Sequence, residues 1–286
     1  MKLTAIIATR GRPAKALAAI EALQLTASGQ HDLEIVVACD DDDPADTAGF
    51  FQAYGAPVRV DVAPRPAGVG ECWNRVASTV DADLMLLMGD DAVITTPLWD
   101  QVIVEFFDRY PWPHPEIAVA ALHDAASPGE ATLFVMRPSW ARHCGLLDTR
   151  FVFWFSDTAL AETYAFISGQ QIPFVDVAVA SPGHGFNPRM RDMKLWWALF
   201  AATRAERLRT AADVRSRLGI PTPANLDALR EIFELRDARS CRDSLTIVQA
   251  MHNRREPDEN YLAARDAALA YLEREGWQRR DDWLET

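Results

Sequence analysis

The chain has 286 residues, of which 49% are hydrophobic, and a formal net charge of -12. That length and apolar content can bury a sizeable core, whereas the negative charge argues against general affinity for nucleic acid or anionic membranes, which bind clustered Lys and Arg. No apolar run reaches the ~20 residues that span a bilayer, the N-terminus has no signal-peptide pattern, and the four cysteines form no CxxC pair. We therefore expect a cytoplasmic protein without membrane insertion.

Short apolar runs alternate with helical patterns through the first part of the chain. The expected strands are Leu3–Ala8, Leu33–Cys39, Val58–Val62 and Leu84–Met88, and the expected helices are Ala14–Leu25, Ala45–Tyr54, Glu71–Val80 and Pro97–Tyr110. This order predicts an α/β fold, with a mostly parallel sheet flanked by helices. In open sheets of this kind, ligands bind beyond the carboxyl ends of the strands.

The pattern changes towards the C-terminus. Three more strands are expected at Ile117–Leu122, Thr132–Met136 and Phe174–Ala180, and then helices at Met193–Leu218, Asn225–Arg236, Ser244–His252 and Pro257–Glu275. Residues 186–217 also carry 8 Lys and Arg against 3 Asp and Glu, which contrasts with the acidic total. We therefore predict a sheet-containing domain over residues 1–190 and a helical C-terminal region over residues 191–286.

Polar residues follow each of the first four expected strands. The segments are Thr9-Arg10-Gly11-Arg12-Pro13, Asp40-Asp41-Asp42-Asp43-Pro44, Pro64-Arg65-Pro66-Ala67-Gly68-Val69-Gly70 and Gly89-Asp90-Asp91. Each segment alone could be an ordinary turn, solvated loop or helix cap. Their joint placement at one edge of the sheet favours a binding site. No G-x-G-x-x-G follows the first strand and the chain has no G-x-x-x-x-G-K-[ST], so neither a dinucleotide site nor a P-loop is indicated.

The ordered set resembles a family 2 glycosyltransferase with the GT-A fold of nucleotide-diphospho-sugar transferases, over about residues 1–185. The resemblance implies a donor site formed by Thr9, Arg10, Arg12, Asp40, Asp42, Arg65, Gly70, Asn74 and Asp90, with Gly68 in the same glycine-containing loop. It also implies a metal ligand in the MGDD segment, where Asp91 is favoured over Asp90 as the direct contact. Carboxylate oxygens suit Mn²⁺ or Mg²⁺, which would stabilise the charge on the leaving diphosphate.

Two later segments extend the resemblance. Asp157 lies at the head of a helical pattern, where aspartate is often simply an N-cap, but similar enzymes carry an acidic base at this point, which predicts inversion of the anomeric centre. Trp154, three residues earlier, is the acceptor-side candidate. His184 lies between glycines after the strand Phe174–Ala180 and is either a loop residue or a second metal ligand. Arg189 and Arg191 either clamp the diphosphate or belong to a solvated helical face.

The resulting hypothesis is a metal-dependent inverting glycosyltransferase that uses a nucleotide-diphospho-sugar, expected to be UDP-linked. A sugar-phosphate nucleotidyltransferase shares the architecture, but the first loop lacks its G-x-G-[ST]-R pattern. A catalytically inactive nucleotide-sugar-binding scaffold is a third alternative. The acceptor could be a protein, a small metabolite, a soluble glycan or, because of the basic segment 186–217, a modified base in DNA.

Overall fold

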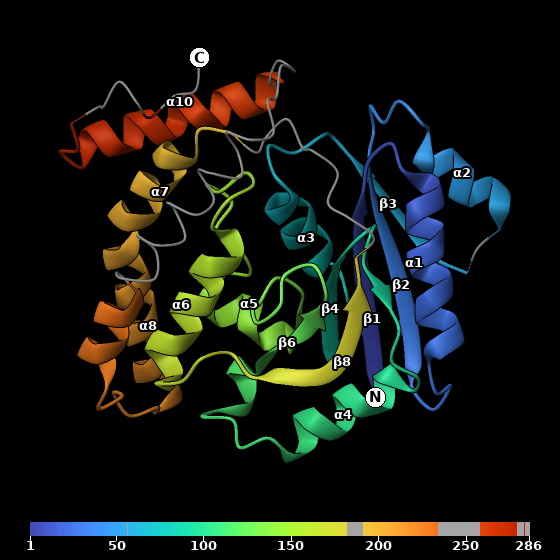
Figure 1. Cartoon of the computed structure of the whole chain (residues 1–286), viewed down its shortest axis with the longest axis horizontal. Helices are drawn as coiled ribbons and strands as arrows, with labels where there is room; N and C mark the ends of the chain where they lie inside the picture. Colours follow the sequence, from blue (N-terminus) through green and yellow to red (C-terminus); the bar gives the residue numbers. More distant parts are fainter. Residues whose placement is uncertain (56, 182–190, 234–257, 279–282, 284–286) are drawn as a thin grey trace. The chain divides into compact units, whose positions relative to one another are not determined.

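The computed structural model describes residues 1–55, 57–181, 191–233, 258–278 and 283 (Figure 1). The chain divides into two compact units, and both are discontinuous in sequence. Unit 1 comprises Met1–Pro66, Glu71–Leu146 and Ile172–His184, and unit 2 comprises Ala67–Gly70, Leu147–Gln171 and Gly185–Thr286. In the part of the chain that the structure describes, no helix is both long and apolar enough to cross a membrane.

Unit 1 is built on one eight-stranded sheet in the order β3-β2-β1-β4-β7-β6-β8-β5. The strands are β1 (Lys2–Thr9), β2 (Asp32–Asp40), β3 (Arg59–Ala63), β4 (Leu84–Gly89), β5 (Val93–Ile94), β6 (Val119–Asp124), β7 (Phe134–Met136) and β8 (Phe174–Ala180). The first four are mutually parallel, as are β6 and β8, whereas β7 runs antiparallel between β4 and β6. The predicted α/β fold with a mostly parallel sheet is confirmed. The short strand β5, antiparallel to β8, was not expected.

Alternation along each strand explains how helices cover this sheet. Leu3, Ala5 and Ile7 of β1 point to one face, where they share a buried cluster with Leu23 of α1 and Phe107 of α4. The helices of unit 1 are α1 (Pro13–Thr26), α2 (Thr47–Tyr54), α3 (Val69–Ala77, which begins in unit 2), α4 (Trp99–Arg109) and α5 (Pro138–Cys144), with a 3₁₀ turn at Pro115–Ile117. Strands buried on both faces read as continuous apolar runs, which is why the sequence pattern located them.

Unit 2 is helical. Its helices are α6 (Ser156–Ser168), α7 (Met193–Ala202), α8 (Arg204–Leu218), a helix over residues 226–233 and α10 (Glu259–Arg274). The prediction of one helix over Met193–Leu218 was wrong, because Thr203 separates two helices. The Thr203 hydroxyl donates to the carbonyls of Leu199 and Phe200, a local bond that competes with continued helix. The helix predicted at Ser244–His252 lies outside the described residues.

A buried ion cluster fixes α6 against α8 within unit 2. Glu162 of α6 is fully buried and pairs with Arg204 at 2.6 Å and with Arg207. Arg207 also donates to the Phe200 carbonyl and lies 4.0 Å from the centre of the Phe200 ring. A buried carboxylate needs such partners, since its desolvation is otherwise costly. Residues 147–171, which the sequence pattern assigned to the sheet domain, thus pack with the C-terminal helices.

Candidate active site

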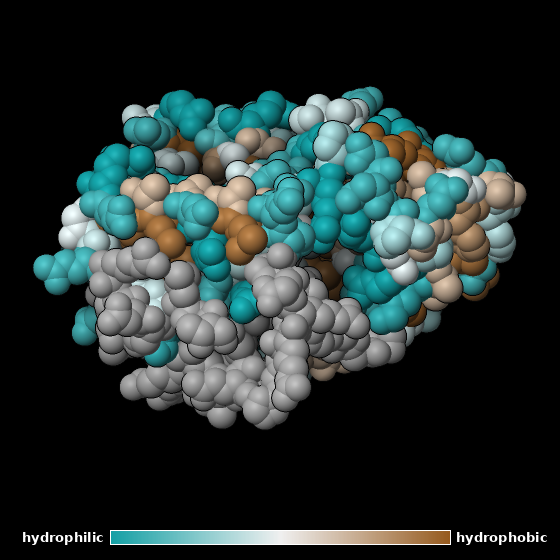
Figure 2. All heavy atoms as spheres, turned by 90° about the horizontal axis from the view of Figure 1, so that it is seen from above, coloured by the Kyte–Doolittle hydropathy of each residue, from teal (hydrophilic) through white to brown (hydrophobic). Residues whose placement is uncertain are grey.

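The carboxyl ends of β1 and β4 form the point where the strand order of unit 1 reverses. From β1 the chain proceeds outward to β2 and β3, whereas β4 returns to the other side of β1. Ligands in open α/β sheets bind at such switch points. In Figure 1, β1 starts beside the label N, so these carboxyl ends point upward. Figure 2 looks down on this edge, and hydrophilic residues crowd its centre.

Thr9 and Asp90 join the two strand ends. The Thr9 hydroxyl donates to Asp90 Oδ2 at 2.7 Å, and both side chains are buried. Burial raises the pKa of the Asp90 carboxyl, while the charge of Arg12 and the Thr9 hydroxyl oppose that rise. This carboxylate is therefore held in place by the hydroxyl of Thr9 at the end of the neighbouring strand.

Arg12 contacts both carboxylates that follow β4. Its Nη2 lies 2.6 Å from Asp90 Oδ1, in an ionic contact without good hydrogen-bond alignment, and its Nη1 lies 3.5 Å from Asp91 Oδ2. The Asp90 side chain is 0% exposed and that of Asp91 is 17% exposed. Asp90 thus has both oxygens engaged, and Asp91 is the carboxylate that a ligand can reach more easily.

Arg10 binds the acidic loop after β2. Its guanidinium contacts Asp40 Oδ2 at 2.9 Å and both carboxylate oxygens of Asp42. The hydrogen bonds from Arg10 hold the pKa of Asp42 below its usual range, and the charge of Arg65 adds to this effect. Burial raises the pKa of Asp40, although Arg10 opposes that rise. Arg10, Asp40, Asp42 and Arg65 therefore form one electrostatic group. Their role in donor binding stays a prediction.

Asp43 organises the same edge and was not among the predicted site residues. Its carboxylate accepts from the backbone amides of Gly11 and Ala45 and from the Thr47 hydroxyl at 2.6 Å. These bonds tie the loop after β1 to the loop after β2 and to the start of α2. The signal in the sequence is Asp43-Pro44, because aspartate before proline favours a turn closed by the aspartate side chain.

The glycine-containing loop has a packing role in unit 2. A Cβ atom at Gly68 would lie 2.7 Å from both Cα and the carbonyl oxygen of Val152, a contact too close for any side chain. Gly70 has more room, because a Cβ atom there would lie 3.5 Å from Leu147 Cβ. Neither glycine has a positive φ. In unit 1, Asn74 is half-buried on α3. For Gly70 and Asn74 the donor-binding role stays a prediction.

Asp157 is not the N-cap of α6, so the ordinary explanation for its position is wrong. The N-cap is Phe155, which has a φ of 72°, and Asp157 lies in the first turn of the helix. Its Oδ1 accepts from the backbone amide of Thr158 at 2.7 Å and from the Thr158 hydroxyl at 3.2 Å. A left-handed backbone at a bulky non-glycine residue is costly and is concentrated at functional sites.

Trp154 offers a polar atom beside this helix start. Its ring packs edge-on against Phe153, with centroids 4.9 Å apart, and its Nε1 is buried without a hydrogen-bond partner among the described residues. Buried donors without partners are rare, and one near a candidate base suggests a ligand contact. The predicted acceptor-side role of Trp154 has this observation in its support.

Arg191 stands just before α7, next to a tightly held aspartate. Asp192 is buried, has a φ of 51° and accepts from the Tyr261 hydroxyl of α10 at 2.9 Å. The same hydroxyl accepts from Trp196 Nε1 at 3.2 Å and lies 3.3 Å from the Arg191 carbonyl. Helix α10 therefore fixes the start of α7. His184 and Arg189, also predicted as site residues, lie outside the described residues.

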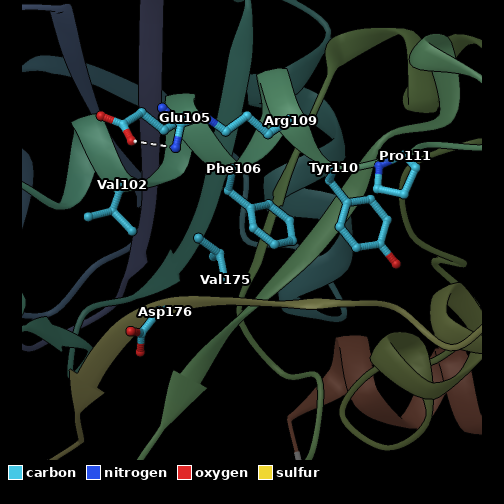
Figure 3. A pocket seen from close by; sticks show the side chains of 8 residues that line it. All are labelled: Val102, Glu105, Phe106, Arg109, Tyr110, Pro111, Val175 and Asp176. Carbon is cyan, nitrogen blue, oxygen red and sulfur yellow. Dashed lines mark ion pairs between the residues drawn. The ribbon is translucent and has the colours of Figure 1, made fainter.

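A shallow pocket on unit 1 lies apart from the switch point (Figure 3). It is formed by α4 and β8, where Phe106 and Tyr110 face Val175 and the Glu105–Arg109 pair, 3.4 Å apart, lies on the rim. Figure 1 shows α4 beside the amino end of β1, the end opposite to the carboxylates. We assign this pocket no part in the chemistry.

Solved structures with the same fold are glycosyltransferases. A mannosyltransferase from Pyrobaculum calidifontis, in complex with GDP-Man and Mn²⁺, has a TM-score of 0.53 and 15% identity, covering 96% of this chain and 81% of that one. Glucosyl-3-phosphoglycerate synthase from Mycobacterium tuberculosis, in complex with Mn²⁺, UDP and glucosyl-3-phosphoglycerate, has a TM-score of 0.50 and 15% identity, with 77% and 81% covered. S. aureus TarS 1-349 in complex with UDP has a TM-score of 0.50 and 11% identity, with 76% and 71% covered.

Sequence comparisons add nothing to these structural matches. No family model matches the chain, and no curated protein matches it either. Identities of this size relate the chains by fold alone. The chain has the GT-A fold of nucleotide-diphospho-sugar transferases.

Proposed function

We propose that this chain is a metal-dependent inverting glycosyltransferase, which moves a sugar from a nucleotide-diphospho-sugar to a hydroxyl acceptor. The observation that carries the proposal is the carboxylate pair Asp90 and Asp91 at the switch point between β1 and β4, together with Arg12. Charged groups of both signs at this place suit a ligand that carries a diphosphate and a divalent cation.

The residues fit a metal with Asp91 as the protein ligand. Among the described residues, no three His, Cys, Asp or Glu side chains gather into a metal-binding cluster. Magnesium and manganese often need only one or two carboxylates, since substrate phosphates and waters supply the other oxygens. Asp91 has the accessible oxygens, and Asp90 positions the strand end. Such a metal would stabilise the charge on the departing diphosphate. His184 would be a further ligand.

The donor's other parts meet the loops after β1 and β2. Arg10 holds Asp40 and Asp42 in place to bind the nucleoside, which we expect to be uridine, with Arg65 alongside. Thr9 belongs to the proposed donor site, where its hydroxyl orients Asp90. The structural matches support a nucleotide-linked donor, because those proteins were solved with UDP or with GDP-Man, and two of them with Mn²⁺.

Asp157 is the proposed base. The acceptor hydroxyl gives its proton to the Asp157 carboxylate as the oxygen attacks the anomeric carbon from the face opposite the diphosphate, so the configuration inverts. The amide and hydroxyl of Thr158 donate to Asp157 Oδ1, which orients the carboxylate. The Trp154 indole N–H would bind an acceptor oxygen.

A thermal-shift panel tests the donor site without knowledge of the acceptor. UDP, GDP and their sugars would be added with and without Mn²⁺ to the wild type, to Asp91→Asn and to the exposed control Asp81→Asn. A ligand at 100 times its Kd stabilises the folded state by about 2.7 kcal/mol. We expect a Mn²⁺-dependent shift for one nucleotide in the wild type and the control, and none in Asp91→Asn. No shift with any nucleotide would contradict the proposal.

The base is tested separately with Asp157→Asn. This variant should keep the thermal shift with the donor but lose at least about 100-fold in donor hydrolysis and transfer, the usual size of general-base catalysis. A variant with unchanged turnover would remove Asp157 from the mechanism. A wild type that binds the donor without any turnover over a range of acceptors would instead favour the nucleotide-sugar-binding scaffold.

A further inference from the structure

Arg12 occupies a position that the proposed function does not fully explain. Its backbone is fixed, because its carbonyl accepts from the amides of Lys15 and Ala16 at the first turn of α1. Its side chain is 44% exposed, yet its guanidinium spans both carboxylates of the proposed metal motif. The positive charge of Arg12 therefore already neutralises part of the negative charge of Asp90 and Asp91 that would attract the metal.

The two contacts differ in strength. The 2.6 Å contact with buried Asp90 is close, and the 3.5 Å contact with Asp91 is long and more open to solvent. A guanidinium has several donor groups in a planar fork, so it can keep one carboxylate while it turns another nitrogen to a phosphate. Arg12 can thus leave Asp91 without uncovering the buried charge of Asp90.

We infer that Arg12 couples metal binding to donor binding. In the free protein the positive charge of Arg12 repels a divalent cation at Asp91, and this repulsion is reduced when the Arg12 guanidinium pairs with the donor diphosphate. The inference rests on the proposed function and adds an order of events to it. Like charges a few ångströms apart repel, so metal affinity is reduced until the diphosphate supplies negative charge. By linkage, the metal must strengthen nucleotide binding by the same factor as the nucleotide strengthens metal binding.

The test measures Mn²⁺ binding to the nucleotide-free protein, by the electron paramagnetic resonance signal of free Mn²⁺. In Arg12→Gln, removal of the opposing charge should tighten Mn²⁺ binding about tenfold, as expected for one unit charge about 6 Å from a divalent cation at a water-like dielectric. Arg59→Gln is the matched control, because Arg59 pairs with Glu34 at 3.0 Å elsewhere on the sheet, and it should change Mn²⁺ affinity by less than about twofold.

The same Mn²⁺ titrations are then repeated in the presence of UDP. In the wild type UDP should increase Mn²⁺ affinity strongly, and in Arg12→Gln the increase should be smaller by about tenfold or more. Arg12→Lys keeps the charge but not the fork, so its Mn²⁺ affinity without UDP should stay near that of the wild type. Arg12→Lys also preserves a positively charged partner for Asp90, so it can be measured even if Arg12→Gln does not fold. Tighter Mn²⁺ binding by Arg12→Lys than by the wild type would then overturn the inference.

Mn²⁺ binding by Arg12→Gln that is no tighter than in the wild type, including no detectable binding, overturns the inference. This failure is distinguishable from failure of the proposed function. If UDP and Mn²⁺ bind the wild type together and Asp91→Asn abolishes this, the site stands and only the role of Arg12 is wrong. If neither UDP nor Mn²⁺ binds the wild type, both proposals fail.

Discussion

The buried charge of Asp90 should make the protein less stable than it could be. The folded state raises the pKa of this carboxyl through burial, so protonation favours folding. Asp90→Asn mimics the protonated form at similar volume, and the Thr9 hydroxyl, 2.7 Å away, can still donate to the amide oxygen. The contact with Arg12 is lost, but that side chain is 44% exposed and keeps water and Asp91, so its loss is worth under about 1 kcal/mol.

The balance predicts a more stable variant. Asp90→Asn removes the desolvation cost of a buried charge, which is several kcal/mol per ion, and it leaves no uncompensated buried charge because Arg12 is exposed to solvent, so we expect a gain of about 1 kcal/mol. The gain should be largest near pH 7 and shrink as the pH falls through the folded pKa of Asp90, because the wild-type carboxyl then takes up its own proton.

Urea unfolding at pH 7 and at two more acidic values measures this directly, with Asp81→Asn as an exposed control expected within about 0.5 kcal/mol of the wild type. The same variant should bind the nucleotide and Mn²⁺ less well. A loss of stability above about 1 kcal/mol at pH 7, or a gain that grows towards acid, would refute the assignment of Asp90 as a buried, desolvated charge.

Two further changes test the packing within unit 2. Gly68→Ala should lower the free energy of unfolding in urea by about 1–3 kcal/mol, because its Cβ atom would overlap the Val152 backbone. Gly70→Ala, within α3, should be neutral or slightly stabilising. Equal effects of the two substitutions would contradict this packing. Tyr261→Phe should cost about 1–3 kcal/mol by the same measurement, because buried Asp192 loses a hydrogen-bond donor, and an unchanged midpoint would show that this bond does not fix α7.

The centre of the sheet could be predicted because β1 and β4 are buried on both faces. The run expected at Leu3–Ala8 is one residue shorter than β1 at each end, and the run expected at Leu84–Met88 is one residue shorter than β4 at its C-terminal end. Strand β5 has two residues, too few for any periodic signal, and it exists because β8 pairs with it. The break at Thr203 has no proline or glycine to mark it, and its cause is a hydroxyl that turns back onto its own helix.

The candidate site could be predicted as a set of residue types but not as a set of contacts. Parallel strands bring their carboxyl ends to one edge, so the loops holding Thr9 and Asp90 were expected together. The partner of each charge was not predictable, because Arg10 and Asp40 are 30 residues apart and Arg12 and Asp91 are 79 apart. Only the folded chain selects which arginine meets which acid.

This selection makes the two adjacent carboxylates after β4 unequal. The buried Asp90 carboxylate accepts a hydrogen bond from Thr9 and contacts Arg12. Of the two carboxylates, only that of Asp91 is exposed to solvent. With Arg12 counted, the three side chains carry a net charge of −1, which attracts a divalent cation weakly. A donor diphosphate that engages Arg12 would release Asp91 from it and add negative charge to the site, so metal and donor would bind best together.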